Sequence, residues 1–366
     1  MPAYGDEGLD LKVVFVMLAT RMTGGHRTVF EFCNGLAQKG NDVSIVSLGF
    51  RGDHRWFDLR VPVKYSRLGG LANLLDFAAG RVGMIGVDVI TMLSRLIPQC
   101  DVAVATYFLT ALATWQSPNC KHRAYFVQHF EPLTFSNPFV SRQALETYFL
   151  PIARATNSSW TRRKLLELTG EDCPVIHPGI DVSVFHPWQE PAEESRFRIV
   201  AYASPKDWKG FQDLVQAIKL LGGERKNIEL VTFGTWRPTL RFQNVSFRHI
   251  TSPTDQELAR TYSGANAVIC ASWFESFPLP PLEAMACGAP VVTTPNGTED
   301  YAVDSENCLI VPPKNPPALH RALSMLMDDR SLGDRIAKQG LITAKRFTWS
   351  EAVNRMSSFL ESVASS

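Results

Sequence analysis

The chain has 366 residues, of which 45% are hydrophobic and 20% charged, and its formal net charge is +1. A single core seldom grows beyond about 250 to 300 residues, so two domains are expected. The balanced charge argues against nucleic acid as the main partner, because such binding usually needs a strongly basic face. The seven cysteines form no Cys-x-x-Cys pair, which indicates reduced thiols and neither a disulfide framework nor a zinc site.

The first half of the chain predicts one sheet domain. An apolar strand at 11–19, a loop over 20–26 and a helix over 27–39 precede a second strand at 42–48, which makes a right-handed βαβ unit. Further strands are expected at 101–106, 123–128, 155–158 and, leaving the domain, 174–181.

Gly24 and Gly25 lie in the first of these loops. Two glycines allow backbone N–H groups to approach an anion closely, and a plain tight turn is the alternative. His129 follows the strand at 123–128, a position that favours a ligand contact over a structural histidine.

Residues 67–95 are rich in Leu, Val, Ile, Met and Gly and include three arginines. This composition predicts an interfacial helix in peripheral contact with the inner face of a membrane, beside an acceptor site. A helix packed on the sheet is the alternative, because Asp76 and Asp88 interrupt the stretch. No run of about 18 apolar residues occurs and the first residues lack a basic secretion-signal start, so a cytoplasmic protein is expected.

The second half repeats the alternation of strands and helices after a polar linker at 189–196. Thr254 and Glu257 form a capping-box pattern, and a final helix is expected over 349–363. The expected strands are 197–203, 228–234, 245–250, 267–272, 290–294 and 308–311, with helices from about 211, 255, 281 and 317.

Glu275 and Glu283 lie eight residues apart, the first in the loop after the strand at 267–272 and the second in the helix that begins near Pro280 and Pro281. Glu275 precedes this helix and Glu283 is expected in its first turn. In open α/β sheets ligands bind at the carboxyl ends of the strands, where a helix N-terminus offers N–H groups to phosphate. Two carboxylates in so apolar a stretch predict a polar task, because an unpaired buried charge is costly. Plain solvated charges are the alternative.

These residues resemble family 4 of the retaining glycosyltransferases. The family pattern is Glu, seven residues, Glu, then Ala-Met-Ala-Cys-Gly and a Pro-Val-Val strand, and residues 275–292 match it closely. Gly297, Glu299 and residues 307–313 follow in the same order. The resemblance implies the α/β architecture called GT-B, in which two Rossmann-like domains with parallel sheets face each other across a cleft. It implies an acceptor domain over 1–185, a nucleotide-sugar donor domain over 186–345, and a helix over 346–366 that crosses back to the first domain.

The resemblance also implies the roles of single residues. Lys209, with Lys206, stabilises the departing diphosphate, Glu283 holds the ribose, and His129 contacts the donor sugar. The implied catalytic residues are His129, Lys209 and Glu275, and the implied donor-binding residues are Gly24, Gly25, Lys206, Lys209, Ser276, Phe277, Leu279 and Glu283.

Two departures from the family pattern stand out. The usual arginine before Lys209 is replaced by Ala203 or Ser204, depending on the alignment. Lys206 can substitute for its charge, but lysine cannot reproduce the planar, bidentate hydrogen bonding of a guanidinium group. Pro278 stands where the family often has glycine, which removes one backbone N–H. No Asp-x-Asp occurs, so a metal-independent reaction without a cofactor is expected, with lysines and the helix N-terminus in place of the ion.

The resemblance therefore implies a retaining glycosyltransferase that moves a hexose-like sugar from a nucleotide-diphosphate sugar, its co-substrate, to an acceptor hydroxyl. The acceptor is expected to be a saccharide or a lipid-linked saccharide in polysaccharide or glycolipid assembly. A nucleotide-sugar 2-epimerase, which shares the fold, is one alternative. An inactive nucleotide-sugar-binding protein is the other, and the missing arginine favours it.

Overall fold

The computed structural model describes residues 10–66, 87–188 and 196–366. The chain divides into two compact units, one formed by Met1–Gly179 with Trp349–Ser366 and the other by Ile180–Thr348. The second unit begins at Ile180 because Ile180 and Phe185 are buried in its core. Among the described residues, no helix has the length and the apolar character needed to cross a membrane.

The first unit is built on a six-stranded parallel sheet with the order β3-β2-β1-β4-β5-β6. Buried β-branched residues dominate the central strands, as expected for a sheet covered on both faces. The strands are β1 (Lys12–Met17), β2 (Asp42–Ser47), β3 (Val63–Tyr65), β4 (Cys100–Ala105), β5 (Cys120–Val127) and β6 (Ala153–Thr156).

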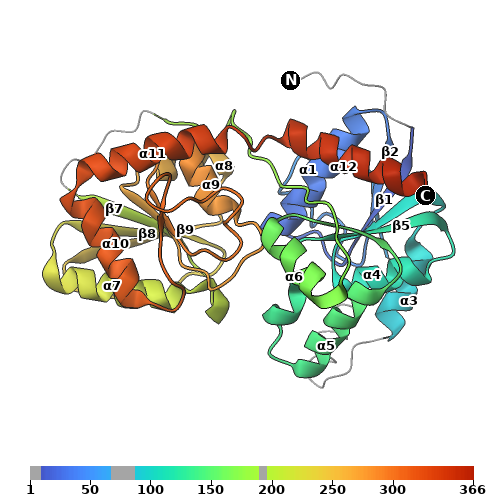
Figure 1. Cartoon of the computed structure of the whole chain (residues 1–366), viewed down its shortest axis with the longest axis horizontal. Helices are drawn as coiled ribbons and strands as arrows, with labels where there is room; N and C mark the ends of the chain where they lie inside the picture. Colours follow the sequence, from blue (N-terminus) through green and yellow to red (C-terminus); the bar gives the residue numbers. More distant parts are fainter. Residues whose placement is uncertain (1–9, 67–86, 189–195) are drawn as a thin grey trace. The chain divides into compact units, whose positions relative to one another are not determined.

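Helices cover both faces of this sheet (Figure 1). Alternate residues of β1 point to opposite faces: Val13 and Phe15 pack with α1 (Gly24–Gln38) and α12 (Trp349–Ala364), whereas Val14 packs with α3 (Val87–Leu96). The remaining elements of the unit are α4 (Phe108–Gln116), η1 (Glu131–Thr134), α5 (Pro138–Glu146), η2 (Thr147–Phe149) and α6 (Ser159–Thr169).

The last helix of the chain, α12, lies against α1 in the first unit (Figure 1). Gly35 permits this approach, because a Cβ at that position would lie 2.3 Å from Cγ2 of Val353. Lys39 Nζ also donates to Oδ1 of Asn354 over 2.9 Å. Residues more than 300 positions apart in the chain thus share one core.

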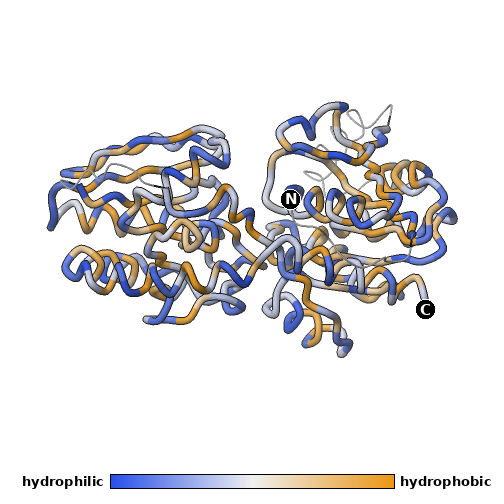
Figure 2. The backbone as a smooth tube through the Cα atoms, turned by 90° about the horizontal axis from the view of Figure 1, so that it is seen from above, coloured by the Kyte–Doolittle hydropathy of each residue, from blue (hydrophilic) through white to orange (hydrophobic). Residues whose placement is uncertain are grey.

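The second unit repeats the design with a parallel sheet in the order β12-β11-β10-β7-β8-β9. Its strands are β7 (Phe197–Tyr202), β8 (Ile228–Gly234), β9 (Val245–Thr251), β10 (Ala267–Cys270), β11 (Val291–Thr293) and β12 (Leu309–Ile310). The helical elements are η3 (Asp207–Lys209), α7 (Phe211–Glu224), α8 (Asp255–Ser263), α9 (Leu279–Ala286), α10 (Pro316–Asp328) and α11 (Arg330–Ala344). In Figure 2 hydrophobic and hydrophilic stretches alternate along the tube, as amphipathic helices on a buried sheet require.

The predicted α/β class with two parallel sheets is confirmed. Two local predictions were wrong. Helix α1 begins at Gly24 rather than 27, because the Thr23 side chain caps it by accepting from the N–H of His26; Gly24 and Gly25 therefore lie in its first turn. Residues 174–181 form no strand, and Val175 makes only a single bridge with Thr156.

The predicted interfacial helix at 67–95 is described only in part, because residues 67–86 lie outside the described residues. Its last nine residues, 87–95, belong to α3, and there Val89 and Leu93 are buried against the first sheet. In this described part the alternative interpretation, a helix packed on the sheet, is correct.

Candidate functional site

In the second unit, β7 and β10 are neighbours from which the chain winds in opposite directions: β8 and β9 lie beyond β7, and β11 and β12 lie beyond β10. Loops that leave such a pair of parallel strands separate at the carboxyl edge and leave room for a ligand. The loops here, residues 203–210 and 271–278, carry the predicted lysines and Glu275.

Lys209 and Glu275 form an ion pair between these two loops. Lys209 Nζ lies 2.6 Å from Oε1 of Glu275, and the two side chains are 22% and 11% exposed. The hydroxyl of Ser272 donates to the same carboxylate oxygen over 2.7 Å. The loop of Glu275 is held by its backbone N–H, which donates to the carbonyl of Asn296. A preorganised cation and carboxylate therefore meet at the edge of the sheet.

Aromatic rings surround the cations. The Trp208 ring stacks on Phe274 with centroids 5.2 Å apart. Lys209 Nζ lies 4.3 Å and Lys206 Nζ 5.4 Å from the centroid of the same Trp208 ring. Burial and the charge of Lys209 lower the pKa of Lys206, and the charge of Glu275 opposes this shift. The two ammonium groups therefore lie near the same aromatic ring, and each senses the carboxylate of Glu275.

Two glycines allow the loops to approach so closely. Gly210 has φ +65°, and a Cβ there would lie 1.9 Å from the carbonyl oxygen of Ala271. Gly297 has φ +90°, and a Cβ there would lie 2.3 Å from the carbonyl oxygen of Glu275. Any other residue at either position would meet both backbone strain and a clash.

Helix α9 starts at Leu279 beside this pair, with Pro278 as its N-cap. Pro280 and Pro281 carry no N–H, so the first turn offers fewer donors to an anion than an ordinary helix start. The expectation that the helix N-terminus supplies several N–H groups is therefore corrected. The backbone N–H groups that remain here belong to Ser276, Phe277 and Leu279, while the dipole of α9 keeps its direction.

Glu283 is buried, with 7% exposure, in the second turn of α9 and not in its first turn as predicted. The helix begins at Leu279, two residues earlier than expected. Burial and the negative charge of Glu283 raise the pKa of Tyr262, whose ring is fully buried. Among the described residues, the Tyr262 hydroxyl has no hydrogen-bond partner.

The remaining predicted residues, Gly24, Gly25 and His129, lie in the first unit, at the carboxyl edge of its sheet. A Cβ on Gly25 would lie 3.4 Å from Oε1 of Gln128, the residue before His129. The structure therefore brings the start of α1 next to the loop after β5. The carbonyl of His129 accepts from the hydroxyl of Tyr148 over 3.2 Å, which fixes this loop.

Glu131, two residues after His129, is 4% exposed. Its carboxylate accepts from the N–H of Phe108 at the start of α4 (2.9 Å) and from the hydroxyl of Tyr125 (3.0 Å). Burial raises the pKa of Glu131 to about 8, although both hydrogen bonds oppose the shift. The residue anchors the loop of His129 from within.

Sequence reasoning missed several residues of the site. The only feature of the sequence that could have indicated them is that they lie near predicted site residues in the chain. Their contacts join separate loops, which a local pattern does not reveal. These residues are Ser272, Trp208, Phe274 and Asn296.

The chain is similar to several known proteins. Residues 196–329 match the family model described as Glycosyl transferases group 1. The chain is 26% identical to the O-antigen biosynthesis protein RfbC of Myxococcus xanthus over 78% of its own length and 22% of that protein. It is 28% identical to a D-inositol 3-phosphate glycosyltransferase of Corynebacterium glutamicum over 50% of each chain. The chain thus spans half or less of the length of these curated relatives.

Among solved structures, the chain is similar to HepE of Anabaena, crystallised in complex with UDP and glucose. The TM-score is 0.74 at 15% identity, over 96% of this chain and 100% of HepE. At this identity the likeness shows the fold, which is the predicted GT-B architecture of two Rossmann-like units. Residues 196–329 of the second unit are therefore similar to the glycosyl transferases group 1 family, and the relatives of the chain include proteins named as glycosyltransferases.

Proposed function

We propose that this chain is a retaining glycosyltransferase that moves a sugar from a nucleotide-diphosphate sugar to an acceptor hydroxyl, in polysaccharide or glycolipid assembly. The ion pair of Lys209 and Glu275 at the switch point of the second sheet carries the proposal. The names of the relatives, which include O-antigen biosynthesis and inositol phosphate glycosylation, and the UDP and glucose of HepE support it. None of these relatives is named as an epimerase, which disfavours that alternative.

Lys209 and Lys206 stabilise the departing diphosphate in this proposal. As the bond to the sugar breaks, the diphosphate gains negative charge, and preorganised cations bind that charge more tightly than they bind the intact donor. The family's arginine position is filled by Ala203 or Ser204, which are 1% and 6% exposed. Lys206, close to the Trp208 ring, is therefore the nearest candidate for the second cation.

Glu275 and the backbone of residues 276–279 bind the sugar, and Glu283 accepts from the ribose hydroxyls. A carboxylate accepts several hydroxyl donors, which suits both tasks. His129 in the first unit positions the sugar and does not attack it. The leaving phosphate takes the proton of the acceptor hydroxyl on the same face, which retains the anomeric configuration. We propose that the reaction needs no metal ion and takes place in the cytoplasm with a saccharide or lipid-linked acceptor.

The test incubates the protein with a panel of nucleotide-diphosphate sugars, with and without acceptor saccharides, and measures release of the nucleotide diphosphate and the anomeric configuration of the product. Glu275→Gln should abolish transfer, whereas the exposed Glu306→Gln control should not. An isomeric nucleotide sugar formed without acceptor would establish the epimerase instead. Binding of the donor with no turnover in any combination would establish the inactive binding protein.

A further inference from the structure

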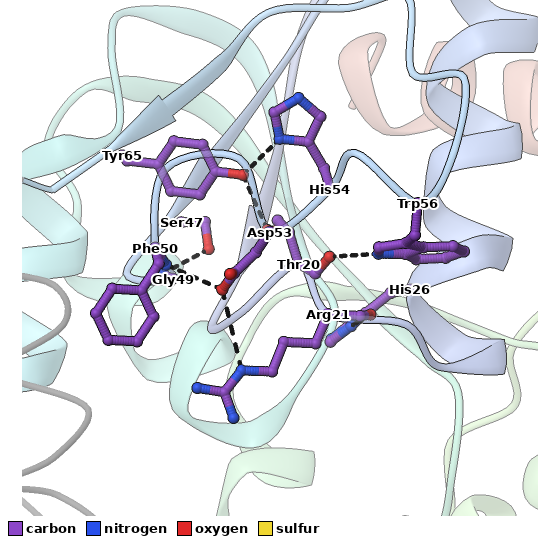
Figure 3. Close-up of polar contacts among 10 residues, drawn as sticks. All are labelled: Thr20, Arg21, His26, Ser47, Gly49, Phe50, Asp53, His54, Trp56 and Tyr65. Carbon is purple, nitrogen blue, oxygen red and sulfur yellow. Dashed lines mark hydrogen bonds and ion pairs between the residues drawn. The ribbon is translucent and has the colours of Figure 1, made fainter. Parts of the chain in front are cut away.

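A second polar network lies at the carboxyl edge of the first sheet, where β1, β2 and β3 end (Figure 3). The hydroxyl of Tyr65, the last residue of β3, lies 2.9 Å from Oγ1 of Thr20 and 2.7 Å from Nδ1 of His54. The loop after β1 and the loop after β2 are therefore tied to the same strand end.

Further contacts hold the loop after β1 and the loop after β2 in place, and we call these two loops the frame. The indole N–H of Trp56 donates to the carbonyl of Thr20 over 2.9 Å. The carboxylate of Asp53 accepts from the N–H of Phe50 over 3.1 Å and lies 3.9 Å from Nε of Arg21. Consecutive turns between residues 50 and 57 keep the loop after β2 compact. The backbone positions from which the neighbouring side chains project are therefore held by these contacts.

The frame presents basic and apolar side chains to solvent. Arg21, Met22 and Phe50 are 65%, 47% and 52% exposed. In Figure 3 the Phe50 ring and the Arg21 guanidinium both extend away from His54. Arg51 and Arg55, on either side of Asp53, are also exposed. We call Arg21, Met22, Phe50, Arg51 and Arg55 the arginine surface.

The charge of these loops is unbalanced. Residues 20–23 and 48–62 contain four arginines and two aspartates, in a chain whose net charge is only +1. In the described part of the chain, the guanidinium groups of Arg51 and Arg55 make no ion pair. Other arginines of the first unit do pair with carboxylates, namely Arg60, Arg142, Arg154 and Arg162. Arg51 and Arg55 are therefore available to an external anion.

We propose that the arginine surface binds a phosphate group of the acceptor, so that the acceptor is a phosphorylated saccharide or a saccharide on a lipid phosphate. Guanidinium groups match the geometry of phosphate oxygens. The exposed Met22 and Phe50 beside them suit the apolar face of a sugar or the start of a lipid chain. That the phosphate belongs to the acceptor rests on the proposed function. That the arginine surface binds phosphate rests on the exposed arginines alone.

Direct binding tests the phosphate recognition. Calorimetry compares glucose 1-phosphate with glucose, and co-sedimentation compares phosphatidylglycerol-containing vesicles with phosphatidylcholine vesicles. The parent protein should bind the phosphorylated member of at least one pair, and the pair it binds shows whether a soluble or a lipid phosphate is the source. The double variant Arg51→Gln/Arg55→Gln should weaken that binding about tenfold, since exposed ion pairs contribute up to about 1 kcal/mol each. The charge-matched control Arg142→Gln/Arg237→Gln, both exposed, should bind like the parent.

Arg51→Lys/Arg55→Lys separates charge from geometry and should lie between the parent and the Gln variant. A parent that prefers neither phosphorylated probe, or a Gln variant that binds as the parent does, would overturn the proposal. Binding of a nucleotide-diphosphate sugar is measured on the same proteins and should be unchanged by the arginine substitutions. If no nucleotide sugar binds but arginine-dependent phosphate binding is seen, the proposed function fails while the phosphate surface stands.

Discussion

Replacing Glu131 by glutamine should make the first unit more stable at alkaline pH and leave it nearly unchanged at acidic pH. In the folded protein burial raises the pKa of Glu131 from 4.5 to about 8. The protonated carboxyl is therefore the form that the core prefers. Its contribution to stability is fully present below pH 4.5 and is lost as the pH rises through about 8.

The size of the effect follows from the difference between the two pKa values. Each pKa unit corresponds to 1.36 kcal/mol, so the fully ionised carboxylate destabilises the folded state by ~5 kcal/mol at most. Glutamine removes the ionisation and keeps both contacts. Its amide oxygen accepts from the N–H of Phe108, and the Tyr125 hydroxyl can turn to accept from its NH₂ group.

The assay is denaturant-induced unfolding at about pH 5 and about pH 9, with hydrogen exchange of β5 and α4 assigning the change to the first unit. We expect Glu131→Gln and the parent to agree within ~1 kcal/mol at the lower pH and to differ by a few kcal/mol at the higher pH. Glu146→Gln, an exposed carboxylate on α5, serves as the control. Stability curves of the Gln variant and the parent that run parallel over the whole range would refute the reasoning.

Three further outcomes are expected. Glu283→Ala should weaken binding of the nucleotide diphosphate without changing the preference among sugars, as measured by calorimetry; unchanged affinity would make Glu283 structural. Lys206→Ala and Lys209→Ala should each slow transfer about a hundredfold, and the double variant should be little slower than the worse single one, because both act on one diphosphate; near-normal turnover of the Lys206 variant would show that the second cation lies elsewhere. Gly210→Ala should lower the unfolding free energy by more than ~1 kcal/mol, because of its positive φ and the Ala271 carbonyl, while Gly223→Ala, with open space on α7, should be neutral or stabilising.

Several features of the fold follow from local sequence pattern. The apolar run of β1 and the helical spacing of α1 form one βαβ unit with β2, because each hydrophobic period matches a single element. The capping box of Thr254 and Glu257 forms as predicted at the start of α8. The strand before Glu275 and the helix that contains Glu283 also form in the predicted order.

Tertiary structure decided which side chains meet. Lys209 and Glu275 are 66 positions apart, and only the adjacency of β7 and β10 brings their loops together. The sequence likewise does not reveal the partner of Glu131, because Phe108 lies on another helix. The local sequence pattern contains the hydrophobic repeat of each helix or strand and the residues that cap its ends, because both depend on neighbours within a few residues. The order of strands and the pairing of their loops depend on packing between distant segments, which local pattern does not contain.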